Sequence, residues 1–282
     1  MSTDNAAITS APAPWACRAT VYSAVFWVSA SQASSPSFNE AAYAPLERDA
    51  PFATDSGKPE GGLATVMLVR YKDTPVGSYD EMMLLPGKFG FEVDSNGRRV
   101  KKSKLRITRI YVSQRNTTWN GRTSHLARFD FQEQADGSAD CKVYPLAEPS
   151  ETPVFQTRFQ PMRYVPAMPM STRAYGWLGI DLEIAQPPLP AGPSEATEAM
   201  LAAAREHGED AAKSELAGTD KWCSSTPYQY SSATKLGWMD LRQADGGNFI
   251  PGAGRWAMAI KMTDTDLRLG ESTWWDPPRS KL

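Results

Sequence analysis

Short segments with strand-type patterns recur along most of this 282-residue chain, and turn-forming residues separate them. In residues 105–112 apolar and polar side chains alternate, which places bulky residues on one face of an extended segment. Residues 63–71 form a nearly continuous apolar run behind two glycines, which favours a buried strand. Further strand-type runs lie at 19–30, 81–85, 88–93, 125–131, 141–144, 154–159, 255–262 and 264–269. Their spacing is typical of an antiparallel meander, so the sequence predicts a mostly β, α+β fold.

One segment has a clear helical pattern. Residues 194–216 are rich in alanine and glutamate, and Ser194 is well placed to be an N-cap. Few bulky apolar side chains occur in this segment, so we expect a solvated outer helix, inserted into the β fold, with His207 at its surface. Residues 31–58 are rich in serine, proline and aspartate. We expect them to form a loop that Tyr43 and Leu46 anchor to the core.

Charge and apolar patterning exclude several classes of partner. The net charge is −2 and the pI about 5.8, so the chain has no basic excess for binding nucleic acid. The sequence contains no stretch of 18 apolar residues without a charge, so we expect no membrane-spanning helix. We also expect no signal peptide. Three widely separated cysteines do not form a disulfide framework, which favours a reducing, cytoplasmic location. We expect a small-molecule substrate as the partner, with a homo-oligomer possible.

The sequence also predicts that no metal or cofactor is required. It contains two histidines and three cysteines, with neither HExxH nor CxxC spacing, and it lacks a dinucleotide-binding fingerprint. The segment GKFG at 87–90 lacks both the spacing and the following helix of a phosphate-binding loop.

Three groups of segments together resemble the acetoacetate decarboxylase superfamily, in particular its fungal members. The first is RYKDTPVGSYDE at 70–81 with PGKF at 86–89. The second is RITRIYVS at 106–113, NGR at 120–122 and HLARF at 125–129. The third is QPPLP at 186–190, GTDKWC at 218–223 and PGAGRW at 251–256. The resemblance covers roughly residues 14 to 265. It implies one domain over 1–282, with 1–13 disordered: an antiparallel, cone-like β-barrel around an apolar cavity with a few outer helices.

The resemblance also implies a chemistry, from which this sequence departs. In the superfamily a lysine of lowered pKa attacks the substrate ketone and forms a Schiff base. Here the loop after Arg122 is short, Ser124 stands where that lysine is expected, and His125 occupies the neighbouring position. Either Schiff-base chemistry is abandoned, or another lysine such as Lys261 takes the role, or the short loop reflects a faulty gene model. Glu81 matches the carboxylate of the family's Tyr-x-Glu motif.

The candidate catalytic residues are therefore Glu81 and His125, as acid–base groups. The candidate substrate-binding residues are Tyr79, Arg122, Ser124, Trp119, Trp177 and Trp256. Glu81, Tyr79 and the turn at 122–125 are expected to border one apolar cavity inside the barrel. Most of these residues also have a structural interpretation. Glu81 and Arg122 could be salt-bridged, His125 could be a surface residue at the start of a strand, and Tyr79 could cap a strand. The three tryptophans could be plain core residues.

The leading functional hypothesis is a cofactor-independent enzyme of secondary metabolism that works without a Schiff base. It would bind an apolar carbonyl compound, polyketide- or terpenoid-like, and promote isomerisation, dehydration or cyclisation. One alternative is a β-keto acid decarboxylase with a relocated lysine. The other is a non-catalytic protein that binds an apolar ligand.

Overall fold

The computed structural model describes residues 11–43, 57–95, 98–114, 116–117, 125–145, 152–188, 221–241 and 253–277. The helix predicted at 194–216, the anchor Leu46, and three candidate site residues, Trp119, Arg122 and Ser124, lie outside these ranges.

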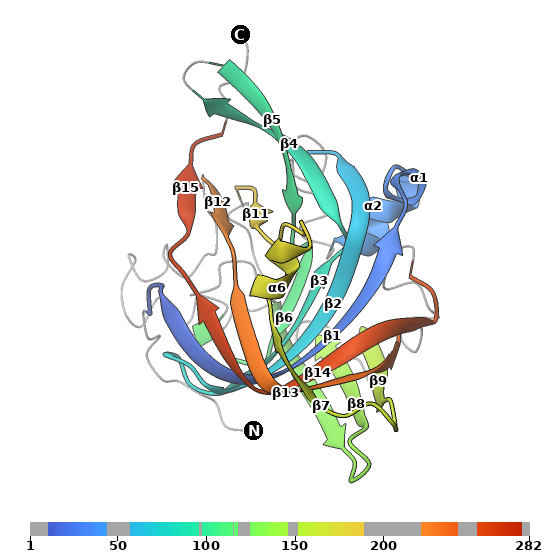
Figure 1. Cartoon of the computed structure of the whole chain (residues 1–282). Coiled ribbons are helices and arrows are strands. Elements are labelled where there is room, and N and C mark those ends of the chain that lie inside the picture. The colour runs from blue at the N-terminus through green and yellow to red at the C-terminus, as the bar shows by residue number, and fades with distance from the viewer. Residues whose placement is uncertain are drawn as a thin grey trace.

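Nine strands form a closed barrel, which confirms the predicted mostly β, antiparallel barrel fold. Their order around the barrel is β1 (Trp15–Val28), β14 (Trp256–Leu269), β13 (Tyr228–Asp240), β9 (Phe155–Pro161), β8 (Ala139–Pro145), β7 (His125–Glu133), β6 (Arg109–Val112), β3 (Tyr79–Leu85) and β2 (Pro59–Asp73). An eleven-pair ladder between β2 and β1 closes the ring. All neighbours are antiparallel except β6 and β7, which are parallel. In Figure 1 the long strands β1, β2, β13 and β14 curve strongly.

A second group of strands continues from the first residues of β2. It runs through β4 (Lys88–Ser95), β5 (Arg98–Leu105), β11 (Ile184–Gln186), β12 (Trp222–Ser225) and β15 (Thr273–Trp275). A short strand, β10 (Met168–Ser171), pairs with the edge of β13. The helices in the described ranges are short, with α1 at Ala30–Ala33, α2 at Pro36–Ala42 and α6 at Arg173–Trp177. Figure 1 shows the β4–β5 hairpin projecting beyond the barrel.

Strand alternation gives the barrel sheet two distinct faces. One face, which we call the barrel-core face, carries a buried cluster to which all nine barrel strands contribute, with Tyr22, Leu68, Met82 and Phe159 among its members. These side chains fill the barrel. The opposite face carries a second buried cluster from β1, β2, β3, β6 and β14. The two faces decide which candidate residues can meet.

The predicted strand at 105–112 is wrong in one respect, because Arg106 divides it. β5 ends at Leu105 in the second group of strands, and β6 begins at Arg109 in the barrel. Between them the buried Arg106 guanidinium lies 4.5 Å from the centre of the Phe89 ring and donates to the Tyr43 hydroxyl at 3.2 Å. A buried guanidinium must keep such partners, so the chain changes sheets where the alternation suggested one strand.

The predicted loop at 31–58 is also partly wrong, because α1 extends into it and α2 lies within it. A capping box starts α1, with the Ser29 and Gln32 side chains each accepting from the other's backbone N–H. The anchor role of Tyr43 is confirmed by its burial. The two runs predicted at 255–262 and 264–269 are one strand, β14, and Asp264 with φ 47° marks the irregularity between them.

Candidate functional site

Glu81 lies in a buried cluster with two tyrosines on the opposite face of the sheet. Its ladder partners are Val69 on β2 and Val112 on β6, both members of the cluster on that face. Glu81 is 5% exposed. The Tyr71 hydroxyl donates to Oε1 at 3.5 Å, and the Tyr79 hydroxyl donates to Oε2 at 3.4 Å. The two rings stack with their centres 4.3 Å apart. The carboxyl group is thus held between two phenols.

The hairpin between β2 and β3 produces this arrangement. Its turn is closed by the N–H of Gly77, which donates to the carbonyl of Thr74 at 3.1 Å. Gly77 has a φ of 91°, a conformation that favours glycine. With this turn, Tyr71 and Tyr79 become cross-strand partners, and Glu81 follows two residues later on the same face.

Burial controls the protonation of the cluster. It raises the pKa of Glu81 to about 7, against the smaller lowering effect of the two hydroxyl donors. Those hydrogen bonds are longer than usual for O–H···O, which is why they offset burial only in part. Glu81 forms no ion pair with any described residue. Burial also raises the pKa of the neighbouring Cys17 to about 11, so Cys17 is a thiol at neutral pH.

Both phenols stay protonated as well, because burial and the nearby Glu81 carboxylate raise the pKa values of Tyr71 and Tyr79 well above 10. In this cluster Glu81 is therefore the group that exchanges a proton near pH 7. It is flanked by two neutral hydroxyl donors and no cation from the described residues. Such an arrangement can move a proton but offers no amine for covalent attack.

His125 is not brought to Glu81, and this corrects the expectation of one shared cavity. His125 is the ladder partner of Tyr111, while Val112, the next residue on β6, is the partner of Glu81. Because side chains alternate, His125 lies on the barrel-core face and Glu81 on the opposite face. His125 is 3% exposed, and its ring centre lies 5.7 Å from that of Tyr111. The barrel interior into which Glu81 was expected to point is filled by packed side chains.

The other described candidates, Tyr79, Trp256 and Trp177, lie in three different environments. The Tyr79 hydroxyl contacts the Glu81 carboxylate directly. Trp256 is half-exposed and, by the alternation along β14, shares its face with Ile260, which packs against the cluster around Glu81. Trp177 lies on α6 and is 87% exposed.

Lys261, the candidate for a relocated Schiff-base lysine, lies on the barrel-core face as the partner of Tyr22. Its Nζ is 3.2 Å from Oε2 of Glu133 and 5.1 Å from the Tyr22 ring centre. Glu133 also accepts from the Tyr22 hydroxyl at 2.9 Å and lies 3.6 Å from the Arg70 guanidinium. Lys261 is thus held in an ion pair with the Glu133 carboxylate.

Sequence reasoning missed Tyr71 and Cys17. A signal for Tyr71 was present, because Tyr71 lies three residues before the turn at 74–77 and Tyr79 lies two residues after it. In a hairpin that spacing makes two residues face each other. Cys17 had no such signal, because its approach depends on the pairing of β1 with β2, which is distant in sequence.

Within the described ranges, no three His, Cys, Asp or Glu side chains are grouped so as to hold a metal ion. No helix in those ranges is both long and apolar enough to cross a membrane.

No family model and no curated protein matches this chain in sequence. Solved structures do match. An acetoacetate decarboxylase from Legionella pneumophila aligns with a TM-score of 0.51 and 11% identity, over 94% of this chain and 88% of that one. This chain has the acetoacetate decarboxylase fold. An acetoacetate decarboxylase-like enzyme from Sphingomonas wittichii RW1 aligns with a TM-score of 0.52 and 8% identity, over 95% of each chain. The enduracididine biosynthesis enzyme MppR, solved with pyruvate, aligns with a TM-score of 0.51 and 11% identity, over 94% of this chain and 91% of that one.

Proposed function

We propose that this protein is an enzyme that acts on a small apolar carbonyl compound by acid–base catalysis at Glu81, without a Schiff base. The observation that carries the proposal is the buried carboxyl group between two phenols, with a pKa of about 7. A carboxyl group whose pKa lies near the working pH is suited to both accepting and returning a proton. Known enzymes with the same fold, including MppR with bound pyruvate, support a small carbonyl-containing substrate.

The face that carries Glu81 suggests the character of the substrate. Beside Glu81 along β3 lies Met83, whose ladder partner is Met67, and both are half-buried. Further along the same face, Met258 and Trp238 are ladder partners and remain 51% and 43% exposed. The face that carries Glu81 thus also carries partly exposed apolar side chains. We propose that an apolar, polyketide- or terpenoid-like body lies along this face with its carbonyl group at Glu81.

The proposed step is a proton transfer next to the carbonyl group. Ionised Glu81 takes a proton from the adjacent carbon, and the electrons of the broken C–H bond form a carbon–carbon double bond. Negative charge moves to the carbonyl oxygen, where a hydroxyl of Tyr79 or Tyr71 donates a hydrogen bond. In a substrate with a carbon–carbon double bond next to the deprotonated carbon, the charge also reaches the far end of that bond, and protonated Glu81 returns the proton there, which completes an isomerisation. The same first step begins a dehydration or a cyclisation.

A proton-exchange assay tests the proposal without the native substrate. The protein is incubated in D₂O with a straight-chain methyl ketone, and mass spectrometry follows deuterium entering the positions next to the carbonyl. We expect Glu81→Gln to slow exchange by about 100-fold or more. Glu92→Gln, which changes an exposed carboxylate on β4, is the matched control and should have no effect.

Two outcomes separate this proposal from its alternatives. A covalent adduct trapped by borohydride with a β-keto acid, and lost in Lys261→Met, would support a relocated-lysine decarboxylase. Saturable ketone binding with no exchange above the buffer rate would support a non-catalytic binding protein. Either result contradicts the acid–base proposal.

A further inference from the structure

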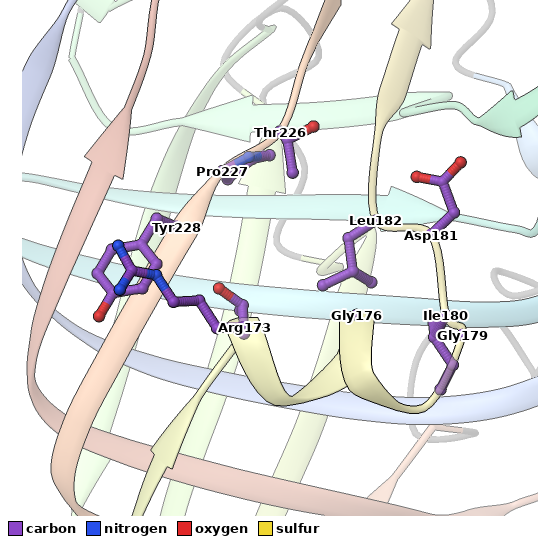
Figure 2. Close-up of a pocket in the computed structure, with 10 residues that line it drawn as sticks. Arg173, Gly176, Gly179, Ile180, Asp181, Leu182, Thr226, Pro227 and Tyr228 are labelled. Carbon is purple, nitrogen blue, oxygen red and sulfur yellow. The ribbon is translucent and has the colours of Figure 1, made fainter.

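A pocket lies between α6 and the start of β13, built from residues outside the Glu81 cluster (Figure 2). Its volume is about 490 Å³, which is within the usual range for small-molecule sites. One wall is fixed by paired hydrogen bonds: the Thr172 N–H donates to the Gln229 carbonyl at 2.9 Å, and the Gln229 N–H donates to the Thr172 hydroxyl at 3.0 Å. These bonds hold the beginning of α6 against β13.

A sharp turn after α6 provides the facing wall. The N–H of Ile180 donates to the carbonyl of Tyr175 at 2.9 Å, and Gly179 adopts a φ of 73°. This glycine lets the chain reverse, so Ile180 and Leu182 line the pocket. Together with Pro227 they make its surface largely apolar.

Arg173 supplies the pocket with a positive charge. Its guanidinium carbon lies 4.9 Å from the centre of the Tyr228 ring, and Figure 2 shows the side chain reaching across that ring. Arg173 forms no ion pair with any residue in the described ranges. Stacking on tyrosine orients the planar guanidinium and leaves its N–H groups available to an anion.

The carboxylates near the pocket already have cationic partners. Asp181 lies on the other side of the pocket from Arg173 in Figure 2, and its carboxylate is 2.6 Å from Nζ of Lys104. That contact holds the pKa of Asp181 below its usual value. Arg268, which also approaches the Tyr228 ring, is paired with Asp266 at 2.7 Å. Among the described residues that line the pocket, Arg173 is therefore the cation that is left to bind a ligand.

We infer that this pocket binds a small carboxylate with an apolar body. The Arg173 guanidinium takes the carboxylate with two parallel hydrogen bonds, and the apolar body packs against Ile180, Leu182 and Pro227. The site is separate from the proposed acid–base centre and does not depend on its chemistry.

The test uses phenylacetate as the probe, with phenylacetamide as its neutral counterpart of the same shape. Binding to the full chain is measured by calorimetry or by ligand-observed NMR. We expect phenylacetate to bind about tenfold or more tightly than the amide, and Arg173→Met to remove that difference. Arg128→Met is the matched control, because Arg128 stacks on Tyr144 at 4.0 Å but does not line the pocket.

Three results would overturn the inference: equal affinity for phenylacetate and its amide, unchanged phenylacetate affinity in Arg173→Met, or an equal loss in Arg128→Met. If Arg173→Met lowers the melting temperature, the comparison of acid with amide on the unmodified protein still decides. A soaked crystal locates the probe, and density elsewhere than between α6 and β13 would also contradict the assignment.

Discussion

Glu81 and His125 lie on opposite faces of the barrel sheet, separated by a single step of strand alternation. Glu81 is the ladder partner of Val112, and His125 is the partner of Tyr111. Two residues that the sequence suggested as acid–base groups of one cavity are thus assigned to different environments. Glu81 belongs to a cluster with two phenols, and His125 belongs to the barrel-core face with Tyr111.

The first prediction concerns this separation. His125→Gln should lower the free energy of unfolding by about 1 to 3 kcal/mol, because it disturbs a buried polar group. It should leave the deuterium exchange rate per folded molecule nearly unchanged. Chemical denaturation together with the exchange assay checks both parts. A loss of exchange in His125→Gln as large as that in Glu81→Gln would show that the two residues act together.

The second prediction concerns stability and pH. The carboxyl group of a glutamate has a usual pKa of 4.5, and that of Glu81 in the folded protein is about 7. Between pH 4.5 and pH 7 the folded protein therefore holds a proton on Glu81 that the unfolded chain has released. The stabilising effect of that proton is fully present below pH 4.5 and is lost as the pH rises through 7. Glu81→Gln removes this dependence and should stabilise the protein by about 3 kcal/mol above pH 7.

Denaturation curves from pH 4 to 9 measure this effect. Glu92→Gln serves as the control, because the Glu92 carboxylate is exposed at its ion pair with Arg99. If Glu81→Gln is no more stable than the unmodified protein at pH 8, then burial does not raise the pKa of Glu81 to about 7, and the prediction is wrong.

The third prediction concerns the two phenols. Each hydroxyl donates to the Glu81 carboxylate and lowers its pKa, so Tyr79→Phe and Tyr71→Phe should each raise the pKa of Glu81 further. The carboxyl C=O stretch, measured by infrared difference against Glu81→Gln, reports this directly. A pKa that falls in either variant would mean that the hydroxyl does not donate to the carboxylate.

Particular residues show how far sequence reasoning reached. The β2–β3 hairpin was accessible, because the turn at 74–77 and the alternation after it are local. The placement of Tyr79 beside Glu81 followed from that local pattern. The position of His125 on the other face of the sheet could not be predicted from a local pattern. It depends on the register between β6 and β7, which pair in parallel after an intervening loop.

Two further features were hidden for physical reasons. β13 contains many small and polar residues, and three of its buried residues, Ser231, Thr234 and Asp240, are polar or charged. No apolar run marked it, although Leu236 and Trp238 alternate. The role of Arg106 was hidden because a charged residue within an alternating segment is normally exposed. Its burial depends on Phe89 and Tyr43, which come from separate parts of the chain.

The fourth prediction tests barrel closure. Gly237 pairs with Pro161 where β13 meets β9, and a Cβ there would lie 2.6 Å from the Phe159 ring and 2.5 Å from a backbone oxygen. Gly237→Ala should therefore cost about 1 to 3 kcal/mol of stability. Gly270→Ala, where a Cβ meets nothing within 4 Å, is the matched control. Equal melting temperatures for the two variants would contradict the described β13–β9 contact.

The measurement that tests the central claim most directly is the pH dependence of deuterium exchange into a methyl ketone. If Glu81 is the base, the exchange rate rises with pH and levels off, with its midpoint near the Glu81 pKa of about 7. The same curve for Glu81→Gln should be flat and lower by about 100-fold. A midpoint near 7 that persists in Glu81→Gln, or an exchange rate that Glu81→Gln leaves unchanged, would contradict the assignment of Glu81 as the acid–base group.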